Sequence, residues 1–241
     1  MNSEPTTFGR HPGSFQVKPV RLAMQTAIGF VVFFGLTLFL PAGDPSWPKG
    51  WAFVLVFIST TTLGAIYLWF ANPEIYFARS RIHDGTKQWD RYLVALLLSI
   101  VTMIFPVAAL DDGRFHWSAV SPWVVAVGYA LVLFGVAATV WAEAVNRFFE
   151  PTVRIQTDRG HEVIDTGPYA LVRHPGYVAA VSLFAGTALA LGSWWALIPA
   201  GLASLVLVVR TRWEDQTLRS ELPGYEEYAR RVRYRLLPGV W

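Results

Sequence analysis

Apolar and polar stretches alternate along the 241-residue chain in a pattern that predicts membrane-spanning helices. Four apolar stretches are long enough to cross a bilayer, which takes about 20 residues, and two shorter ones of roughly 16 residues follow. They cover residues 20–40, 50–70, 91–110, 122–146, 176–191 and 194–210. The pattern therefore predicts an all-α integral membrane protein with about six transmembrane helices.

The last two apolar stretches are separated only by Gly192 and Ser193, which predicts a C-terminal helical hairpin. Gly186, Gly192 and Gly201, together with several alanines, would let the two helices of this hairpin approach each other closely. Because each helix is short, the hairpin either just crosses the bilayer or dips into it.

The composition supports a membrane protein. Hydrophobic residues make up 54% of the chain and charged residues only 15%, whereas a soluble domain has about 25% charged residues. The first apolar stretch is too long for a signal peptide and has no small-residue cleavage site after it, so we expect a retained helix. The absence of cysteine excludes disulfides, thiolate metal sites and a cysteine nucleophile. The formal charge of +3 is modest and its basic residues flank apolar stretches, which indicates a membrane surface and not nucleic acid.

The distribution of basic residues predicts the orientation. They gather before the first apolar stretch, in the loop 71–91 and after residue 210, where the chain has Arg10, Lys18, Arg21, Arg79, Arg81, Lys87, Arg91, Arg210, Arg212, Arg219, Arg230, Arg231, Arg233 and Arg235. Since basic loops face the cytoplasm, we expect both termini there, in the inner (plasma) membrane of a bacterium. The polar segments 147–175 and 211–241 then share the cytoplasmic face.

The first of these polar segments ends at a predicted helix start. Proline is tolerated in the first helical turn, so Pro175 predicts a helix capped by His174, with the N–H groups of Gly176, Tyr177 and Val178 directed into a cytoplasmic cavity. With Arg173 beside it, this helix N-terminus suits an anionic group. The alternative is that Arg173 and His174 only reach toward lipid headgroups.

The second polar segment carries two carboxylates and an arginine where the chain leaves the membrane. Arg210 and Glu214 are four residues apart and share one helical face, and Asp215 adjoins them. This placement favours a functional site for Arg210 and Glu214. Pro223-Gly224 ends the helix, and a further helix with Tyr225, Tyr228 and self-paired charges (Glu226, Glu227, Arg230, Arg231) follows.

Other polar residues are weaker candidates. Residues of the loop after the second span could close over a site, and residues at the end of the fourth span could line it: Asn72, Glu74, His83, Glu143, Asn146 and Arg147. The chain contains no histidine–carboxylate cluster with metal-ligand spacing, so no metal site is predicted, and it has neither a G-x-S-x-G motif nor a glycine-rich phosphate loop.

Taken together, the two segments resemble the isoprenylcysteine carboxyl methyltransferase family, whose C-terminal half is shared by phospholipid methyltransferases. The first block is His161-x-Val163-Ile164-x-Thr166-Gly167-x-Tyr169-x-x-x-Arg173-His174-Pro175-x-Tyr177. The second, after the hairpin, is Arg210-x-x-x-Glu214-Asp215-x-x-Leu218, then Pro223-Gly224-Tyr225-x-x-Tyr228. The resemblance covers residues 150–241, and the earlier helices match only as membrane spans.

The resemblance implies a cytoplasm-facing pocket for S-adenosylmethionine, which is released as S-adenosylhomocysteine, and a methyl acceptor that arrives from the bilayer. The implied cofactor-binding residues are His161, Val163, Tyr169, Arg173, His174, Pro175, Tyr177, Glu214, Asp215, Tyr225 and Tyr228. Arg210 and Glu214 are the implied catalytic residues, with Arg210 facing the acceptor. Residues 1–149 would form the acceptor side, and residues 150–241 the cofactor-binding segment, the hairpin and the cytoplasmic tail of one integrated domain.

The predicted function is methyl transfer to a lipophilic or small-molecule acceptor, a carboxylate in the first instance. Alternatives are a phospholipid or small-molecule N- or S-methyltransferase and an NADPH-dependent sterol or enone reductase, because those reductases share a related Arg-His-x-x-Tyr block and an ending similar to residues 234–238. A membrane scaffold or small transporter is the non-enzymatic alternative. The bilayer is the expected partner, and the sequence does not fix the oligomeric state.

Overall fold

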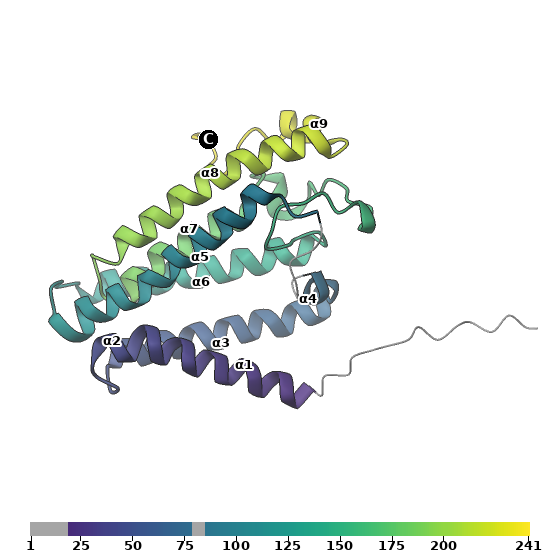
Figure 1. Ribbon diagram of the computed structural model, residues 1–241. Coiled ribbons are helices and arrows are strands. Elements are labelled where there is room, and N and C mark those ends of the chain that lie inside the picture. Colours follow the sequence, from purple (N-terminus) through teal and green to yellow (C-terminus); the bar gives the residue numbers. More distant parts are fainter. Residues whose placement is uncertain (1–18, 79–84) are drawn as a thin grey trace, which may run out of the picture.

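A computed structural model describes residues 19–78 and 85–241, which form helices and connecting loops without a β-strand. Within these residues the chain passes six times along the length of the molecule (Figure 1). The passes are α1 (Pro19–Phe34) continued by the π-helix η1 (Gly35–Phe39) and α2 (Leu40–Ala42), then α3 (Pro48–Ala71), α5 (Gln88–Ala108) continued by the π-helix η2 (Ala109–Phe115), α6 (Pro122–Val145), α7 (Pro175–Ala190) and α8 (Leu197–Glu221). The predicted all-α class and the six helical segments are confirmed.

Three of these passes are long and apolar enough to cross a membrane: Pro48–Ala71, Gln88–Phe115 and Pro122–Val145. The segments Ile28–Ala42 and Pro175–Ala190 are apolar but shorter. Large hydrophobic side chains such as Leu55, Phe70 and Leu205 are exposed along the helices, at 68%, 79% and 62% of their surface. An apolar helix surface of this extent is unfavourable in water and favourable in contact with lipid. The described chain is therefore an integral membrane protein.

The last helix is longer than the apolar pattern predicted. Hydropathy ends near residue 210, but α8 continues as a regular helix to Glu221 and rises beyond the bundle (Figure 1). Charged residues with good helix propensity extend it. Arg210, Glu214 and Asp215 therefore lie on one continuous helix.

The glycines were predicted to let α7 and α8 approach closely, but Gly186 of α7 lies against α6 instead. α7 packs most extensively against α6 and less against α8. A Cβ atom on Gly186 would lie 2.8 Å from the backbone nitrogen of Val132 in α6, whereas one on Gly201 in α8 would meet nothing within 4 Å. Gly192 adopts φ +79° in the turn between α7 and α8, a conformation that glycine tolerates. The small residues thus join α7 to α6.

One end of the bundle, here called the polar end, carries the polar segments. It holds α4 (Glu74–Ala78), the segment 146–174 with the short 3-10 helices η3 (Thr157–Arg159) and η4 (Gly167–Ala170), and α9 (Tyr225–Arg231). α6 and α8 end there, and α5 and α7 begin there (Figure 1). Arg10, Lys18, Arg79, Arg81 and His83 lie outside the described residues.

Candidate active site

The polar end contains a cavity with an empty volume of about 820 Å³, part of which is open to solvent. Its lining comes from the loop after α6, from η4 and the start of α7, and from α8 and α9. The two sequence blocks, which are separated by the hairpin, therefore meet around one space. Leu222, Tyr225, Tyr228 and Ala229 form a buried cluster that packs against Val163 and its neighbours and holds α9 against the cavity wall.

Most of the residues implied by the resemblance line this cavity. They are His161, Val163, Tyr169, His174, Pro175, Tyr177, Glu214, Tyr225 and Tyr228. Arg173, Asp215 and Arg210 are not among the lining residues and lie behind the wall. Asn146 also lines the cavity, while Asn72 instead donates a hydrogen bond of 2.7 Å to the backbone oxygen of Glu143.

The start of α7 forms one wall. His174 precedes Pro175, the first helical residue, as expected, but its side chain makes no capping hydrogen bond. The N–H groups of Tyr177 and Val178 donate to the backbone oxygen of His174, at 3.1 and 3.4 Å, so the expectation that these two groups point into the cavity is wrong. Gly176, in the first turn, is the lining residue whose N–H has no intrahelical acceptor by position.

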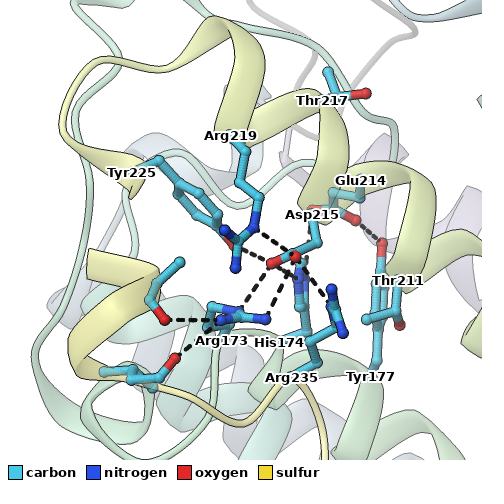
Figure 2. A network of polar contacts seen from close by, with 12 residues as sticks. Arg173, His174, Tyr177, Thr211, Glu214, Asp215, Thr217, Arg219, Tyr225 and Arg235 are labelled. Carbon is cyan, nitrogen blue, oxygen red and sulfur yellow. Dashed lines mark hydrogen bonds and ion pairs between the residues drawn. The ribbon is translucent and has the colours of Figure 1, made fainter. Parts of the chain in front are cut away.

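Glu214 is the carboxylate that α8 presents to the cavity, and its side chain is 22% exposed. The Tyr177 hydroxyl donates a hydrogen bond to it (Figure 2). The His174 ring lies parallel to that of Tyr177, with centroids 5.6 Å apart, and its Nδ1 is 3.9 Å from the Glu214 carboxylate. Within the described chain, the buried Nε2 of His174 has no hydrogen-bond partner. Glu214, Tyr177 and His174 thus offer one negative charge and two aromatic faces.

Asp215, the next residue, is buried in a network of arginines (Figure 2). Its carboxylate accepts hydrogen bonds from Arg219 (3.1 Å), Arg235 (3.0 Å) and the Tyr225 hydroxyl (3.1 Å). Arg173 also pairs with it: its Nε lies 2.9 Å from Oδ1, and its Nη2 donates a hydrogen bond of 3.4 Å to Oδ2. Burial alone would raise the pKa of Asp215, but the His174 ring, whose Nε2 lies 3.6 Å from Oδ1, and the positive charges of Arg173 and Arg235 outweigh it and hold the pKa below its ordinary value.

Arg173 serves the same network. Its guanidinium donates to the backbone oxygens of Ala229 and Val232, both at 3.1 Å, and its own N–H donates to the backbone oxygen of Tyr234 at 3.0 Å. Arg173 therefore connects the start of α7 to α9 and the segment after it. With its charge neutralised by Asp215, it is not positioned to receive an anion from the cavity.

Arg210 is also buried and paired. Its Nε and Nη2 donate to the two carboxylate oxygens of Asp90, at 2.7 and 3.1 Å, and Nη2 donates to the backbone oxygen of Pro151 at 2.7 Å. The guanidinium carbon lies 5.3 Å from the centroid of the Tyr177 ring. Asp90 escaped the sequence analysis; its only signal is a carboxylate at the start of an apolar span, where a charge is costly.

The opposite wall, residues 146–164, supplies residues that the sequence analysis also missed. Arg154 is held by two hydrogen bonds to Glu150, at 2.8 and 2.9 Å, and one of 2.7 Å to Asp158. Burial, with the charges of Arg154 and Arg159, lowers the pKa of His161 to about 4, so His161 is neutral near pH 7. Burial also raises the pKa of Tyr169, whose hydroxyl accepts a 3.1 Å hydrogen bond from Asn146 and remains protonated.

A second, mostly apolar cavity, here called the bilayer groove, has an empty volume of about 930 Å³ and lies between α3, α4, α6 and α7. Phe57, Leu68, Val136 and Leu183 are among its lining residues, and Glu143 and Tyr76 supply polar groups. Glu143 stands one helical turn before Asn146, which lines the first cavity. Each cavity therefore has a lining residue at the end of α6.

The described chain is thus an all-helical membrane protein with a polar cavity at one end and an apolar groove beside it. Residues 123–222, from α6 to the end of α8, match the phospholipid methyltransferase family.

Two curated proteins are similar to the chain. Protein-S-isoprenylcysteine O-methyltransferase B of Arabidopsis thaliana is 24% identical over 178 residues, which cover 68% of this chain and 85% of the plant protein. The cobalt-zinc-cadmium resistance protein CzcN of Cupriavidus metallidurans is 29% identical over 154 residues, which cover 61% of this chain and 66% of that protein. The predicted resemblance is confirmed: the chain is similar to the phospholipid methyltransferase family over residues 123–222 and to an isoprenylcysteine O-methyltransferase.

Proposed function

We propose that the protein is an integral membrane methyltransferase that binds S-adenosylmethionine in the polar-end cavity and methylates a lipophilic acceptor from the bilayer groove. The observation that carries the proposal is the pairing of Glu214, the charged group presented by α8, with aromatic side chains inside a cavity built from the two methyltransferase-like blocks. Both termini would then lie in the cytoplasm, since the described basic residues Lys87, Arg219 and Arg235 lie at the polar end.

The lining residues fit this cofactor. S-adenosylmethionine supplies a methyl group on a positively charged sulfur. Glu214 and the faces of Tyr177 and Tyr169 favour cationic groups, and the N–H of Gly176 at the start of α7 is a donor for a carboxylate. The tyrosines stay protonated and donate hydrogen bonds without competing as nucleophiles.

The same lining disfavours NADPH. Among the described lining residues, Glu150, Glu162 and Glu214 are acidic, and Arg154 is saturated by Glu150 and Asp158. The phosphates of NADPH need free cations or several open N–H groups. The charge of the cavity thus supports the sulfonium cofactor over the dinucleotide of a reductase.

For the acceptor, we propose a carboxylate on a lipophilic molecule, because the plant relative is named an O-methyltransferase. A carboxylate is already a nucleophile, so the protein has to position it and exclude water. Transfer to the amine of a lipid is the second candidate. One observation favours it: the Arg210 charge, expected to hold a carboxylate, is neutralised by Asp90.

Ligand-dependent unfolding of the purified protein in detergent tests the cofactor. We expect saturating S-adenosylhomocysteine to raise the melting temperature by roughly 5 °C or more and NADPH to leave it unchanged. Glu214→Gln keeps an acceptor for Tyr177 but removes the charge, and should weaken S-adenosylhomocysteine binding about tenfold.

The control is Glu221→Gln, which removes a carboxylate of the same helix that lies outside the cavity and is 42% exposed. It should bind the cofactor product like the wild type. Stabilisation by NADPH and not by S-adenosylhomocysteine would overturn the proposal. Radiolabelled methyl transfer to lipids ending in a carboxylate or in an amine then separates the two acceptors.

A further inference from the structure

Two ion pairs join the start of α5 to α8, and they differ in their surroundings. Lys87 donates to Glu221 at 2.7 and 2.8 Å, with side chains that are 30% and 42% exposed. Asp90 and Arg210, one turn further into the bundle, form a pair whose side chains are 0% and 7% exposed. The exposed pair already joins α5 to α8 at the surface. Joining these two helices therefore does not by itself explain why a second, buried charge pair is present.

The buried pair reaches the cavity wall through backbone groups. The N–H of Val153 donates to Asp90 Oδ2 at 2.7 Å, and Arg210 Nη2 donates to the oxygen of Pro151 at 2.7 Å. Val153 and its neighbour Thr152 line the cavity. Asp90 and Arg210 together thus hold the segment 151–153 in place from behind.

The pair also reaches Tyr177. Asp90 occupies Nε and Nη2 of Arg210, which fixes the plane of the guanidinium, and this plane lies 5.3 Å from the Tyr177 ring centroid. A cation near the face of a phenol withdraws electron density from it and strengthens its hydroxyl as a donor. The hydroxyl of Tyr177 donates to Glu214. Asp90 is thereby connected to the cavity carboxylate through Arg210 and Tyr177.

We propose that Asp90 is a positioning residue of the active site, which sets the geometry of Tyr177–Glu214 and of segment 151–153 by holding Arg210. The inference rests on the proposed methyltransferase function. It assigns to α5, a helix outside both sequence blocks, a part in positioning the wall of the polar-end cavity. Burial of a charge pair is costly in itself, so a role in arranging the site explains its presence better than stability does.

The test compares Asp90→Asn, Asp90→Glu and the double variant Asp90→Leu/Arg210→Met with the wild type. Glu221→Gln, which breaks the exposed pair between the same two helices, is the matched control. For each protein in detergent, calorimetry gives the affinity for S-adenosylhomocysteine, unfolding gives the melting temperature, and methyl transfer gives kcat and KM.

We expect Asp90→Asn to weaken S-adenosylhomocysteine binding about tenfold and to lower kcat, because the amide leaves either Arg210 or the Val153 N–H without an acceptor. Asp90→Glu keeps the carboxylate and should recover part of both losses. The double variant removes both charges, so it should recover the melting temperature lost in Asp90→Asn while affinity and kcat stay low. Glu221→Gln should stay within about twofold of the wild type.

Wild-type affinity in Asp90→Asn, or recovery of affinity along with melting temperature in the double variant, would overturn the inference and leave the proposed function standing. If Asp90→Asn does not fold, Asp90→Glu and the double variant still decide between these outcomes. Failure of the wild type to bind S-adenosylhomocysteine would instead overturn the proposed function, and the inference with it.

Discussion

Glu214 and Asp215 are adjacent carboxylates with opposite environments. Successive residues on a helix point about 100° apart, so Glu214 faces the cavity and Asp215 faces the arginines of the segment before α7, of α8 and of the C-terminal segment. In the sequence, both are implied cofactor-binding residues. Asp215 is structural because Arg173 and Arg235 pair with it, whereas Glu214 stays free to face a ligand. Both arginines come from distant parts of the chain, so the sequence around the two carboxylates does not distinguish them.

His161 predicts a pH dependence of folding. Its pKa is lowered to about 4 in the folded protein, from an ordinary value of 6.5. Between these values the unfolded chain binds more protons than the folded one, so stability is full above pH 6.5 and falls as the pH drops toward 4. We expect the melting temperature of the protein in detergent to fall across this window.

The variant His161→Asn should flatten this dependence. Asparagine offers an oxygen where His161 Nδ1 accepts the N–H of Gln156 at 3.3 Å, and it does not titrate. Asp215 has a lowered pKa, so its own contribution is lost only at pH below its ordinary value of 3.8. An unchanged slope between pH 6.5 and 4 in the variant would show that His161 is not the group responsible.

At the scale of elements, hydropathy predicted where helices cross and Pro175 predicted where α7 begins. The end of α8 was predicted by Pro223-Gly224 and not by hydropathy, because its last turns are polar and are helical through propensity and packing against α9 and the loop wall. The contacts of Arg210 were not predictable. Its partner Asp90 is 120 residues away in the sequence. An i,i+4 spacing predicts only which residues of the same helix share a face, so it could not identify a partner on another helix.

α7 packs against α6 because glycines lie on the faces where these two helices meet. A Cβ on Gly128 in α6 would lie 2.3 Å from the backbone nitrogen of Ala190 in α7, and backbone cannot move aside as a flexible side chain can. Gly128→Ala should therefore lower the stability by about 1–3 kcal/mol, which lowers the melting temperature by several degrees. Gly201→Ala, where the added Cβ meets nothing within 4 Å, should be neutral or stabilising. Equal effects at both positions in thermal unfolding would contradict the α6–α7 packing.

For the whole molecule, the arrangement of the two cavities separates two ligands of different polarity. The polar-end cavity is reached from water, and the bilayer groove lies among helices whose outer surfaces face lipid. Their linings come within three residues of each other where α6 ends, at Glu143 and Asn146. A lipophilic acceptor in the groove could thus present its polar end to the cofactor cavity without crossing water.

This arrangement predicts that filling the bilayer groove impairs the acceptor and spares the cofactor. Ala65 on α3 lines the groove and is exposed, so a larger side chain there occupies the groove without disturbing the core. We expect Ala65→Trp to raise KM for a lipophilic acceptor about tenfold or more, since loss of an apolar binding surface costs roughly 25 cal/mol per Å². Calorimetry should show unchanged affinity for S-adenosylhomocysteine.

Ile66→Trp is the matched control for this prediction. Ile66 is the next residue on α3, is 53% exposed and is not a lining residue of the groove. It adds the same side chain at the same depth, so its methyl-transfer kinetics should match the wild type. If both variants raise KM equally, the effect comes from a bulkier helix surface and the acceptor enters elsewhere. If only Ala65→Trp does, the space between α3 and α6 is the route by which the acceptor reaches the cofactor cavity.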